Sequence, residues 1–392
     1  DKSLDRRNFV ISQMEKAKYI SKAQRDSICL IPITLSYQVQ DHNSGIAPYF
    51  RDMLRRTMNA KKPKKSSYRN IEDYQADSLR WKNDGLYGFL EKTRKADGSK
   101  YNLDKDGLRI YTTINYKMQK YAEEAVDQHL RSGLQKTFFN ELKWNSNRPF
   151  ARDVDQEMVK TLMMQARRWS DRYITAKNAG LSEQEILKSF DEPVKMRVFA
   201  YNKNGYVDTT MTPNDSIRYY KSFLRASFIA IEPFTGHVKA YVGGNNYRYF
   251  KYDNVTLGKR QVGSVIKPFL YTLAMEQGMT PCDRVTNVPQ SFIVNGEAWT
   301  PHSTDKPEMI GKTVTLKWGL TKSSNNISAY LMKVFGPEAM AKKMKQMGIS
   351  SHIDAVPSLC VGPADISLCE MVAAYNTYPS QGLYIAPLFV TR

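Results

Sequence analysis

The spacing of apolar residues predicts two short helices at the start of the chain. Between Asp5 and Tyr19 the apolar positions recur at the interval of an α-helix, and residues 20–24 have the character of a turn into a second short helix. Residues 33–39 instead alternate between apolar and polar side chains, which is typical of an extended strand.

The middle of the chain combines one predicted strand with several predicted helices. β-Branched residues dominate residues 108–114, so we expect a strand there, followed by an amphipathic helix over residues 118–126. Residues 153–175 carry one methionine-rich apolar stripe and predict a single long core helix, because such a stripe usually reflects packing rather than a cofactor site. Ser182 and Glu185 have the spacing of a capping box before a short helix.

A different pattern begins near Phe223 and predicts an α+β domain, after strands and turns over residues 195–220. Residues 227–232 and 237–243 resemble two strands separated by the turn 233–236, which indicates a β-hairpin. Helical spacing then returns in four segments, residues 264–277, 314–334, 337–347 and 365–378.

Composition limits the class of protein and suggests a partner. At roughly 150 residues per domain, the 392 residues should form two to three domains, and 41% hydrophobic residues argue against extensive disorder. The net charge of +19 suggests either an anionic partner or a solubilising surface. Residues 51–69 contain many Lys and Arg against Asp52 alone, and we expect a solvated face or loose connector there more often than a polyanion contact.

The cysteine, histidine and hydropathy patterns argue against a structural metal site and a membrane span. No CxxC pair and no zinc-type histidine spacing occur, so we expect no structural metal and mostly buried thiols among the four cysteines, Cys29, Cys282, Cys360 and Cys369. The longest apolar run, residues 28–33, contains a proline and is far shorter than the roughly 20 residues of a membrane span. No signal peptide is visible.

The segment that is most informative about chemistry is residues 260–269. Ser264 follows a glycine and opens a predicted helix that ends at Gly278, and Lys267 shares a helix face with it. A lysine neutralised by burial or by neighbouring cations can take the proton of a serine hydroxyl, and a helix N-terminus favours the oxyanion formed when serine attacks a carbonyl. Because S-x-x-K is common, a surface serine beside a surface lysine is the alternative for this segment alone.

A second polar segment, residues 320–327, makes the chemical interpretation stronger. It contains an S-x-N triplet, whose hydroxyl can relay a proton and whose carboxamide can hold both a substrate amide and the lysine. Two registers fit, Ser323–Asn325 and Ser324–Asn326, and we prefer the first because Ile327 then continues the packed face of a helix. The alternative for this segment is an N-terminal helix cap.

These segments together resemble a class A penicillin-binding protein, a bifunctional peptidoglycan synthase. The transpeptidase-like segments are residues 231–238, 260–269, 299–302, 313–316 and 368–375. Residues 6–14 resemble the last motif of the family's glycosyltransferase domain. The resemblance implies an α+β, multidomain chain: the tail of a mostly helical glycosyltransferase domain over residues 1–45, a linker or pedestal region over 46–223, and the N-terminal part of a penicillin-binding/serine transpeptidase-like domain over 224–392.

What the resemblance implies is D,D-transpeptidation by serine acyl transfer. Ser264 would attack the penultimate D-Ala carbonyl of a stem peptide with Lys267 as general base, and an amine of a neighbouring stem would then accept the acyl group. Ser323 would relay the proton and Asn325 would orient the substrate. β-Lactams would acylate Ser264 as substrate mimics, and its backbone N–H would form half of an oxyanion hole. The implied substrate-binding residues are Gly263 and Trp299.

The sequence departs from the family pattern in one motif. No K-T-G or K-S-G triplet follows Asn325. The resemblance therefore leads us to expect the strand carrying this motif beyond Arg392, and the glycosyltransferase glutamates and membrane anchor before Asp1. On this expectation, residues 1–392 alone are inactive or poorly folded.

The resemblance also implies partners, cofactors and a location. It implies peptidoglycan stem peptides, a lipid-linked precursor, β-lactams, the cytoplasmic membrane and other cell-wall proteins as partners, and no nucleic acid. It implies no cofactor for the transpeptidase and leaves room for a divalent metal in the glycosyltransferase part. The expected location is the bacterial cell envelope, at the periplasmic or outer face of the cytoplasmic membrane. Two alternatives stay open, a non-catalytic cell-wall scaffold and a penicillin-hydrolysing serine hydrolase.

Overall fold

The computed structural model of the chain describes residues 2–34, 45–68 and 70–392. Its contacts divide the chain into two compact units, residues 1–44 and residues 45–392. Most of the strand expected over residues 33–39 lies outside the described residues, so that expectation stays a prediction.

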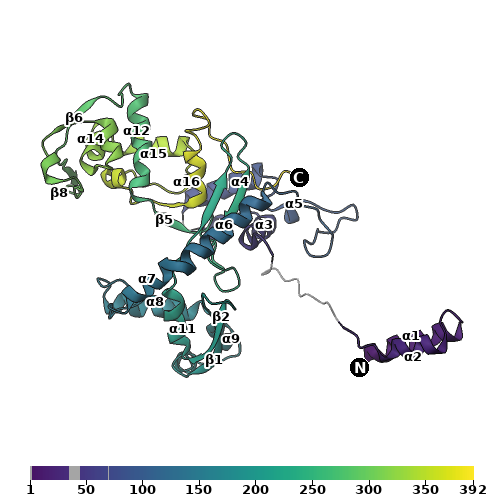
Figure 1. Cartoon of the computed structure of the whole chain (residues 1–392). Coiled ribbons are helices and arrows are strands. Elements are labelled where there is room, and N and C mark those ends of the chain that lie inside the picture. The colour runs from purple at the N-terminus through teal and green to yellow at the C-terminus, as the bar shows by residue number, and fades with distance from the viewer. Residues whose placement is uncertain (1, 35–44, 69) are drawn as a thin grey trace. The chain divides into compact units, whose positions relative to one another are not determined.

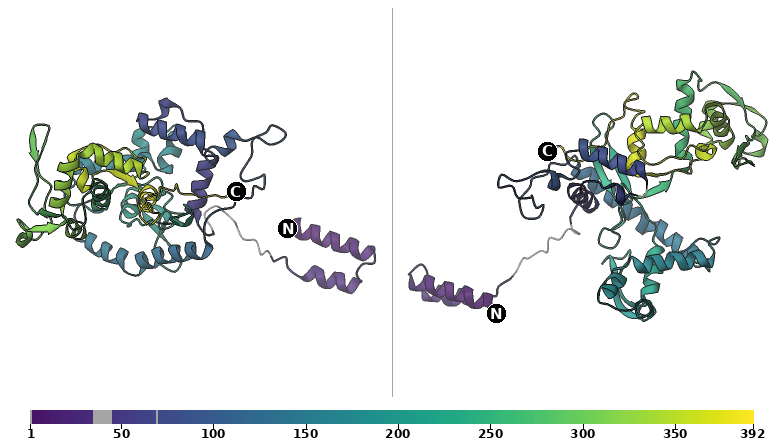
Figure 2. Two further views of the ribbon diagram at one scale, coloured as in Figure 1. Left: turned by 90° about the horizontal axis from the view of Figure 1, so that it is seen from above. Right: turned by 180° about the vertical axis from the view of Figure 1, so that it is seen from behind.

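The first unit is a hairpin of two helices, as the apolar spacing predicts. Helices α1 (Lys2–Lys16) and α2 (Lys22–Leu30) lie side by side in both views of Figure 2. Ser21 begins α2 with a capping box, in which its hydroxyl accepts from the backbone N–H of Gln24. An ion pair of 2.9 Å between Arg25 and Glu15 joins the two helices. Ile11 is the only buried side chain within them, so the hairpin has almost no core of its own.

The second unit begins with a buried helix in the basic run. Helix α3 (Pro48–Met58) turns one apolar face inward while its arginines lie on the other face. Of the two expectations for residues 51–69, the part up to Met58 thus has the solvated face and is not a loose connector. Arg56 forms ion pairs with Asp52 at 3.0 Å and Asp253 at 3.3 Å. The high charge of the run concealed this helical spacing. Three further helices follow, η1 (Lys65–Ser67), α4 (Ile71–Asn83) and α5 (Phe89–Lys92).

The predicted hairpin is present as strands β3 (Phe228–Ile231) and β4 (Val238–Val242). The predicted amphipathic helix is α6 (Tyr116–His129), and it packs against β4 (Figure 1). The fully buried amide of Gln119 takes the place of a neighbouring strand, because it accepts from Tyr241 N–H at 2.7 Å and donates to Tyr241 O at 2.9 Å. One helix thus holds the hairpin through bonds of the kind that a sheet uses.

The strand expected over residues 108–114 is reduced to a single bridge. Thr112 pairs with Val390, and Tyr111 N–H donates to Arg392 O at 2.7 Å. The backbone is therefore paired with the last residues of the described chain, and no regular strand forms. Local β-propensity identified a pairing segment but not its irregular partner.

The pedestal region is more helical than its sequence pattern indicated. Helix α6 runs on through the π-helical turn η2 (Leu130–Leu134) into α7 (Gln135–Leu142). The long helix expected over residues 153–175 is two helices, α8 (Gln156–Arg168) and α9 (Asp171–Asn178), because Ser170 caps a new helix start. Trp169 at the break is 79% exposed and is not a core residue.

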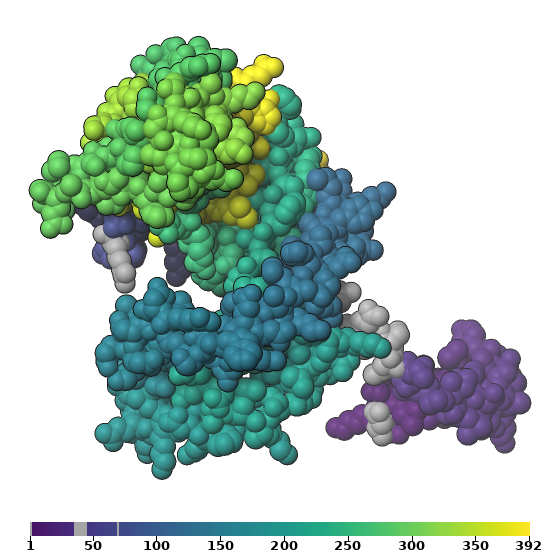
Figure 3. Space-filling model, turned by 60° about the vertical axis from the view of Figure 1, so that its left-hand side comes forward, coloured from purple at the N-terminus to yellow at the C-terminus, as the bar shows by residue number. Residues whose placement is uncertain are grey.

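Two further elements complete this region. The capping box of Ser182 and Glu185 begins α10 (Glu183–Lys188), as predicted. Strands β1 (Val194–Phe199) and β2 (Tyr206–Met211) pair as expected, but the segment after them is a helix, α11 (Pro213–Lys221). Thr212 caps α11, and the strands and turns expected up to residue 220 were wrong there. Figure 3 shows the blue surface of α7 and α8 continuing into the teal surface of β1, β2 and α11.

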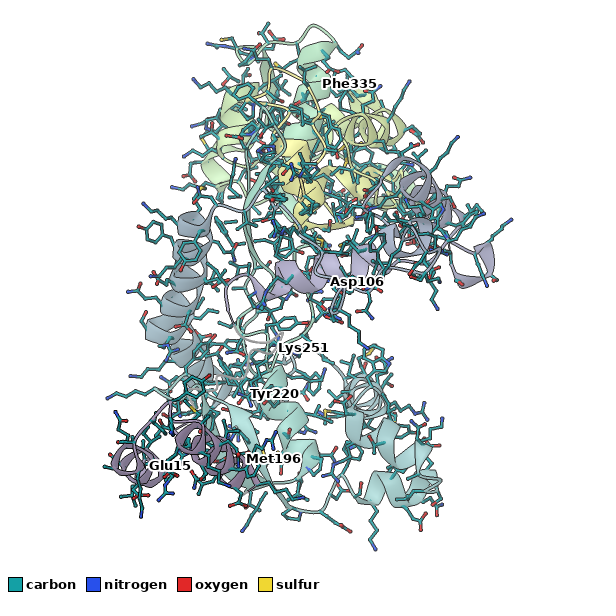
Figure 4. All side chains as sticks on the ribbon, turned by 90° about the vertical axis from the view of Figure 1, so that its right-hand side faces the viewer. Glu15, Asp106, Met196, Tyr220, Lys251 and Phe335 are labelled. Atoms are coloured by element: carbon teal, nitrogen blue, oxygen red, sulfur yellow. The ribbon has the colours of Figure 1, made fainter. Side chains whose placement is uncertain are left out.

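An aromatic cluster joins this region to the part of the chain that contains the β-hairpin β3–β4. Phe199, Phe223 and Phe250 are buried against one another, and Tyr220 lies 5.6 Å from the Phe250 ring. Figure 4 labels Tyr220 of the cluster and Lys251, the residue that follows Phe250. The cluster and the amide of Gln135, which bonds Ser222 O and Leu224 N–H, fix the chain where it passes between the two regions.

The remaining elements form a second core that positions the candidate site. Helix α12 (Lys267–Glu276) follows the short helix η3 (Gly263–Ile266) and packs against α14 (Asn325–Phe335) and α15 (Pro337–Gln346). The helix predicted over residues 314–334 is divided, because α13 (Leu316–Thr321) ends before α14 begins. The other elements here are β5 (Lys259–Gln261), β6 (Arg284–Thr286), β7 (Phe292–Val294), β8 (Glu297–Trp299), η4 (Pro307–Met309), β9 (Thr313–Thr315), η5 (Pro357–Val361), β10 (Asp365–Ser367) and α16 (Leu368–Tyr375).

Candidate active site

Lys267 is a buried lysine surrounded by neutral hydrogen-bond acceptors. Its side chain is 1% exposed, and its Nζ donates to Ser323 O at 2.5 Å, Ser323 Oγ at 3.0 Å and Asn325 Oδ1 at 2.7 Å. Among the described residues, no carboxylate lies within ion-pair distance of it. Burial therefore lowers the pKa of Lys267, although the thiol of Cys360 and the carboxylate of Asp305 act in the opposite direction. A lysine in this environment can become a neutral base more readily than a lysine in water.

The turn that carries Ser323 is built by the end of α13. Ser323 N–H donates to Leu320 O at 3.0 Å and Ser324 N–H donates to Gly319 O at 2.8 Å, which is the bonding pattern of a Schellman motif. Glycine usually occupies the position of Ser323 in this motif because φ is positive there, and φ of Ser323 is 54°. The chain accepts a strained serine conformation, and this conformation turns both the carbonyl and the hydroxyl of Ser323 toward Lys267.

The two registers of the S-x-N triplet have different surroundings. Ser323 and Asn325 bond Lys267, whereas Ser324 is fully buried, caps α14 and donates from Oγ to Asp305 Oδ2 at 2.6 Å. The helix-cap alternative thus describes Ser324. Asn326 is also buried and donates to Asn287 Oδ1 at 2.8 Å.

Ser264 lies exposed on η3, one turn before Lys267. Within the part of the chain that the structure describes, its hydroxyl forms no hydrogen bond with Lys267, Ser323 or Asn325. The structure thus brings Lys267, Ser323 and Asn325 together and leaves Ser264 beside them, open to solvent. Only the first turn is a tight helix, and α12 proper starts at Lys267 rather than at Ser264.

The two residues expected to bind substrate lie in different settings. Gly263 directly precedes Ser264 with φ of 55°, and its N–H donates to Gly362 O at 2.9 Å. Trp299 ends the hairpin β7–β8, where its half-buried ring packs 5.8 Å from the ring of Phe292. No hydrogen bond of the described residues links Trp299 to Lys267.

Several neighbours of the site escaped the reasoning from sequence. Asn325 Nδ2 donates to His302 O at 2.8 Å, and Asp305 accepts from Ser324. Gly362 packs against the backbone of Gly263, and Tyr375 Oη donates to Val265 O at 2.5 Å. These contacts join segments far apart in the chain, and none has a local signal beyond the isolated glycine of the V-G-P triplet at residues 361–363.

The burial of the four cysteines differs from the expectation of mostly buried thiols. Cys360 is buried and burial raises its pKa to about 12, Cys29 and Cys369 are half-buried, and Cys282 is exposed, so the expectation of mostly buried thiols was wrong. Across residues 2–34, 45–68 and 70–392, no group of three or more His, Cys, Asp or Glu side chains is arranged to hold a metal ion. In the same residues, every helix is too short or too polar to cross a membrane.

Comparison with protein families divides the larger unit into two matched regions. Residues 145–224 match the penicillin-binding protein middle domain, and residues 226–392 match the penicillin binding protein transpeptidase domain. The transpeptidase match includes every residue of the Lys267 cluster.

Curated relatives match the whole chain at low identity. Penicillin-binding protein 1A of Vibrio cholerae is 22% identical and that of Escherichia coli is 24% identical, each over 100% of this chain and over 47% and 45% of the relative. Penicillin-binding protein 2D of Bacillus subtilis is 35% identical over 44% of this chain and 25% of the relative. The chain thus spans about half the length of the 1A relatives that it matches.

A solved structure supports the same fold. The crystal structure of penicillin-binding protein 1A from Haemophilus influenzae matches 99% of this chain and 53% of its own, with a TM-score of 0.55 and 21% identity. Taken with the site, these findings define a penicillin-binding transpeptidase domain that follows its middle domain. The chain belongs to the class A penicillin-binding proteins, as its motifs indicated.

Proposed function

We propose that this chain carries the serine D,D-transpeptidase of a peptidoglycan synthase. The observation that supports this most directly is the buried Lys267, whose three hydrogen bonds all go to neutral acceptors on Ser323 and Asn325. A catalytic lysine needs a pKa low enough to be neutral at the working pH, and burial lowers the pKa of Lys267. The exposed position of Ser264 one turn away leaves the nucleophile accessible to a large substrate.

In the proposed first step, neutral Lys267 Nζ takes the hydroxyl proton of Ser264. The Oγ of Ser264 attacks the carbonyl carbon of the penultimate D-Ala, the bond to the last D-Ala breaks, and its nitrogen leaves as an amine after taking a proton. Ser323 Oγ is proposed to carry that proton to the leaving group, and its distance of 3.0 Å from Lys267 Nζ supports this role. The product is an ester on Ser264.

In the proposed second step, an amine of a neighbouring stem peptide attacks the ester. The C–N bond of the crosslink forms, the ester C–O bond breaks, and a proton of the attacking amine passes through Lys267 to Ser264 Oγ. The amide of Asn325 holds Lys267 with its oxygen and His302 O with one N–H, so its second N–H is available for the substrate backbone. Gly263 and Trp299 are proposed to line the path of the stem peptide.

The nucleophile is tested by labelling the whole protein with fluorescent penicillin. Ser264→Ala should abolish the label, whereas Ser291→Ala, an exposed serine of the same domain, should label like wild type. Stoichiometric labelling of Ser264→Ala would refute the assignment. The lifetime of the label separates two functions, because a transpeptidase keeps the acyl group for long periods and a penicillin-hydrolysing enzyme releases it quickly.

The proposal extends to partners and surroundings that the relatives suggest. The substrates are proposed to be peptidoglycan stem peptides and, in a glycosyltransferase part, a lipid-linked precursor, at the outer face of the cytoplasmic membrane. The 392-residue chain by itself is proposed to be inactive, since it lacks a K-T-G or K-S-G triplet after Asn325. Penicillin acylation of the purified chain at the rate of the whole protein would contradict this.

A further inference from the structure

The S-x-N turn is held from its outer side by one carboxylate. Asp305, on the loop between β8 and η4, accepts the hydroxyl hydrogen of Ser324 at 2.6 Å. Ser324 is fully buried, and its backbone is also bonded, since its N–H donates to Gly319 O and its carbonyl oxygen accepts from Ser328 Oγ at 2.9 Å. The same loop supplies His302 O to Asn325. The Ser323–Asn325 turn is therefore hydrogen-bonded on one side to the β8–η4 loop and on the other side to the end of α13.

Asp305 also lies close enough to act on Lys267 by its charge. Three groups outside α12 act on the amine of Lys267: the Ser323–Asn325 turn through hydrogen bonds, and the thiol of Cys360 from η5 and Asp305 from the loop through electrostatics alone. Cys360 is neutral in ordinary conditions because burial raises its pKa to about 12. Among the described residues, Asp305 is thus the carboxylate whose negative charge acts on Lys267, although it does not form an ion pair with it.

We propose that Asp305 is a positioning residue for the acyl transfer, which holds the strained turn of Ser323 against Lys267 through Ser324. This inference rests on the proposed function and names a residue to which the motifs give no role. The φ of Ser323 is 54°, a left-handed backbone conformation that is strained for a serine. A turn under such strain keeps its shape only if neighbours fix it, and the bond from Ser324 to a carboxylate is the strongest kind available there.

Two substitutions of Asp305 separate its bond from its charge. Asp305→Asn keeps an oxygen that can accept from Ser324, and it removes the negative charge near Lys267. Asp305→Ala removes both. We expect Asp305→Ala to lower the penicillin acylation rate about tenfold or more on the plateau above the acid limb, because a hydrogen bond to a charged group is lost, with a smaller change in penicillin affinity. We expect Asp305→Asn to recover most of that rate.

The charge has its own readout in the pH profile. Without the carboxylate, the pKa of Lys267 falls further, so the acid limb of the acylation rate of Asp305→Asn should move to lower pH. Asp283→Asn is the matched control, because Asp283 accepts from the hydroxyl of Thr280 at 2.8 Å in the same domain and does not act on Lys267.

The outcomes are distinct. Wild-type rates in Asp305→Ala would overturn the proposal, and so would equal losses in both variants with an unshifted pH profile, which would indicate a purely structural role. If Asp305→Ala does not fold, the proposal is still tested by comparing the acylation rate and the acid limb of Asp305→Asn with those of Asp283→Asn. Failure of the proposed function itself would appear separately, as wild-type labelling of Ser264→Ala.

Discussion

Replacing Gly362 with alanine tests how tightly the acylation segment is held. Gly362 has φ of 80°, and an added Cβ would lie 2.6 Å from the carbonyl carbon and 2.7 Å from the Cα of Gly263, the residue before Ser264. Carbon atoms in contact prefer about 3.5 Å or more, so the two segments must separate by about 1 Å. None of the atoms that the Cβ meets belongs to a flexible side chain, so the strain cannot be relieved by rotating one.

The magnitude can be estimated from two contributions. A left-handed conformation costs alanine about 1–2 kcal/mol, and weakening the 2.9 Å bond from Gly263 N–H to Gly362 O costs about 1 kcal/mol. Displacement of the nucleophile has a larger kinetic effect, since a misplacement of about 1 Å can reduce a rate by about a hundredfold. We therefore expect Gly362→Ala to lose about 2–3 kcal/mol of unfolding free energy and most of its acylation rate.

The matched control is Gly278→Ala at the end of α12. Gly278 has φ of 90° and no heavy atom within 4 Å of its added Cβ, so it carries the conformational cost without the clash. Thermal unfolding and the rate of penicillin acylation should be measured for both variants. Equal stability losses together with equal acylation rates would refute the reasoning.

Three further predictions concern the site and its support. Ser323→Gly should relieve the strain at φ of 54° and keep the stability near wild type while acylation falls sharply, and unchanged acylation would exclude Ser323 from proton transfer. Burial lowers the pKa of Lys267, so the acylation rate should rise with pH through this lowered pKa. Between the lowered pKa and the ordinary value near 10.4, the unfolded chain binds more protons than the folded chain, so the free energy of unfolding should rise with pH. Lys267→Met should lose this pH dependence of stability. Gln119→Ala should cost about 2–4 kcal/mol in chemical denaturation because both backbone groups of Tyr241 lose their partner, and a loss below 1 kcal/mol would show that water replaces the amide.

The sequence predicted the elements that local rules control. The hairpin β3–β4, helix α6 and the capping box of Ser182 follow from spacing within a few residues, and the structure has them. Errors arose where a cap interrupts an apolar stripe, as at Ser170, or where charge conceals a buried face, as in α3. Both cases need information about what packs against the segment.

The site followed the same division between local and distant signals. The motifs indicated Lys267 and the S-x-N segment, because they occupy short stretches with a recognisable chemistry. Asp305 and Gly362 could not be found in this way, since their contacts with Ser324 and Gly263 cross 19 and about a hundred residues of chain. The positive φ of Ser323 had no sequence signal either, because serine gives no warning that a glycine conformation is required.

The amide of Gln119 has a consequence for how the central hairpin can grow. Along the outer edge of β4, Tyr241 is bonded to Gln119, Lys239 O accepts from Asn115 N–H at 2.9 Å, and Val238 N–H donates to Leu388 O at 3.0 Å. These bonds occupy groups that another strand would need along this edge, and β3 pairs with no strand besides β4 in the described chain. Strand addition along this part of β4, whether by the protein's own chain or by an aggregating neighbour, is thereby disfavoured.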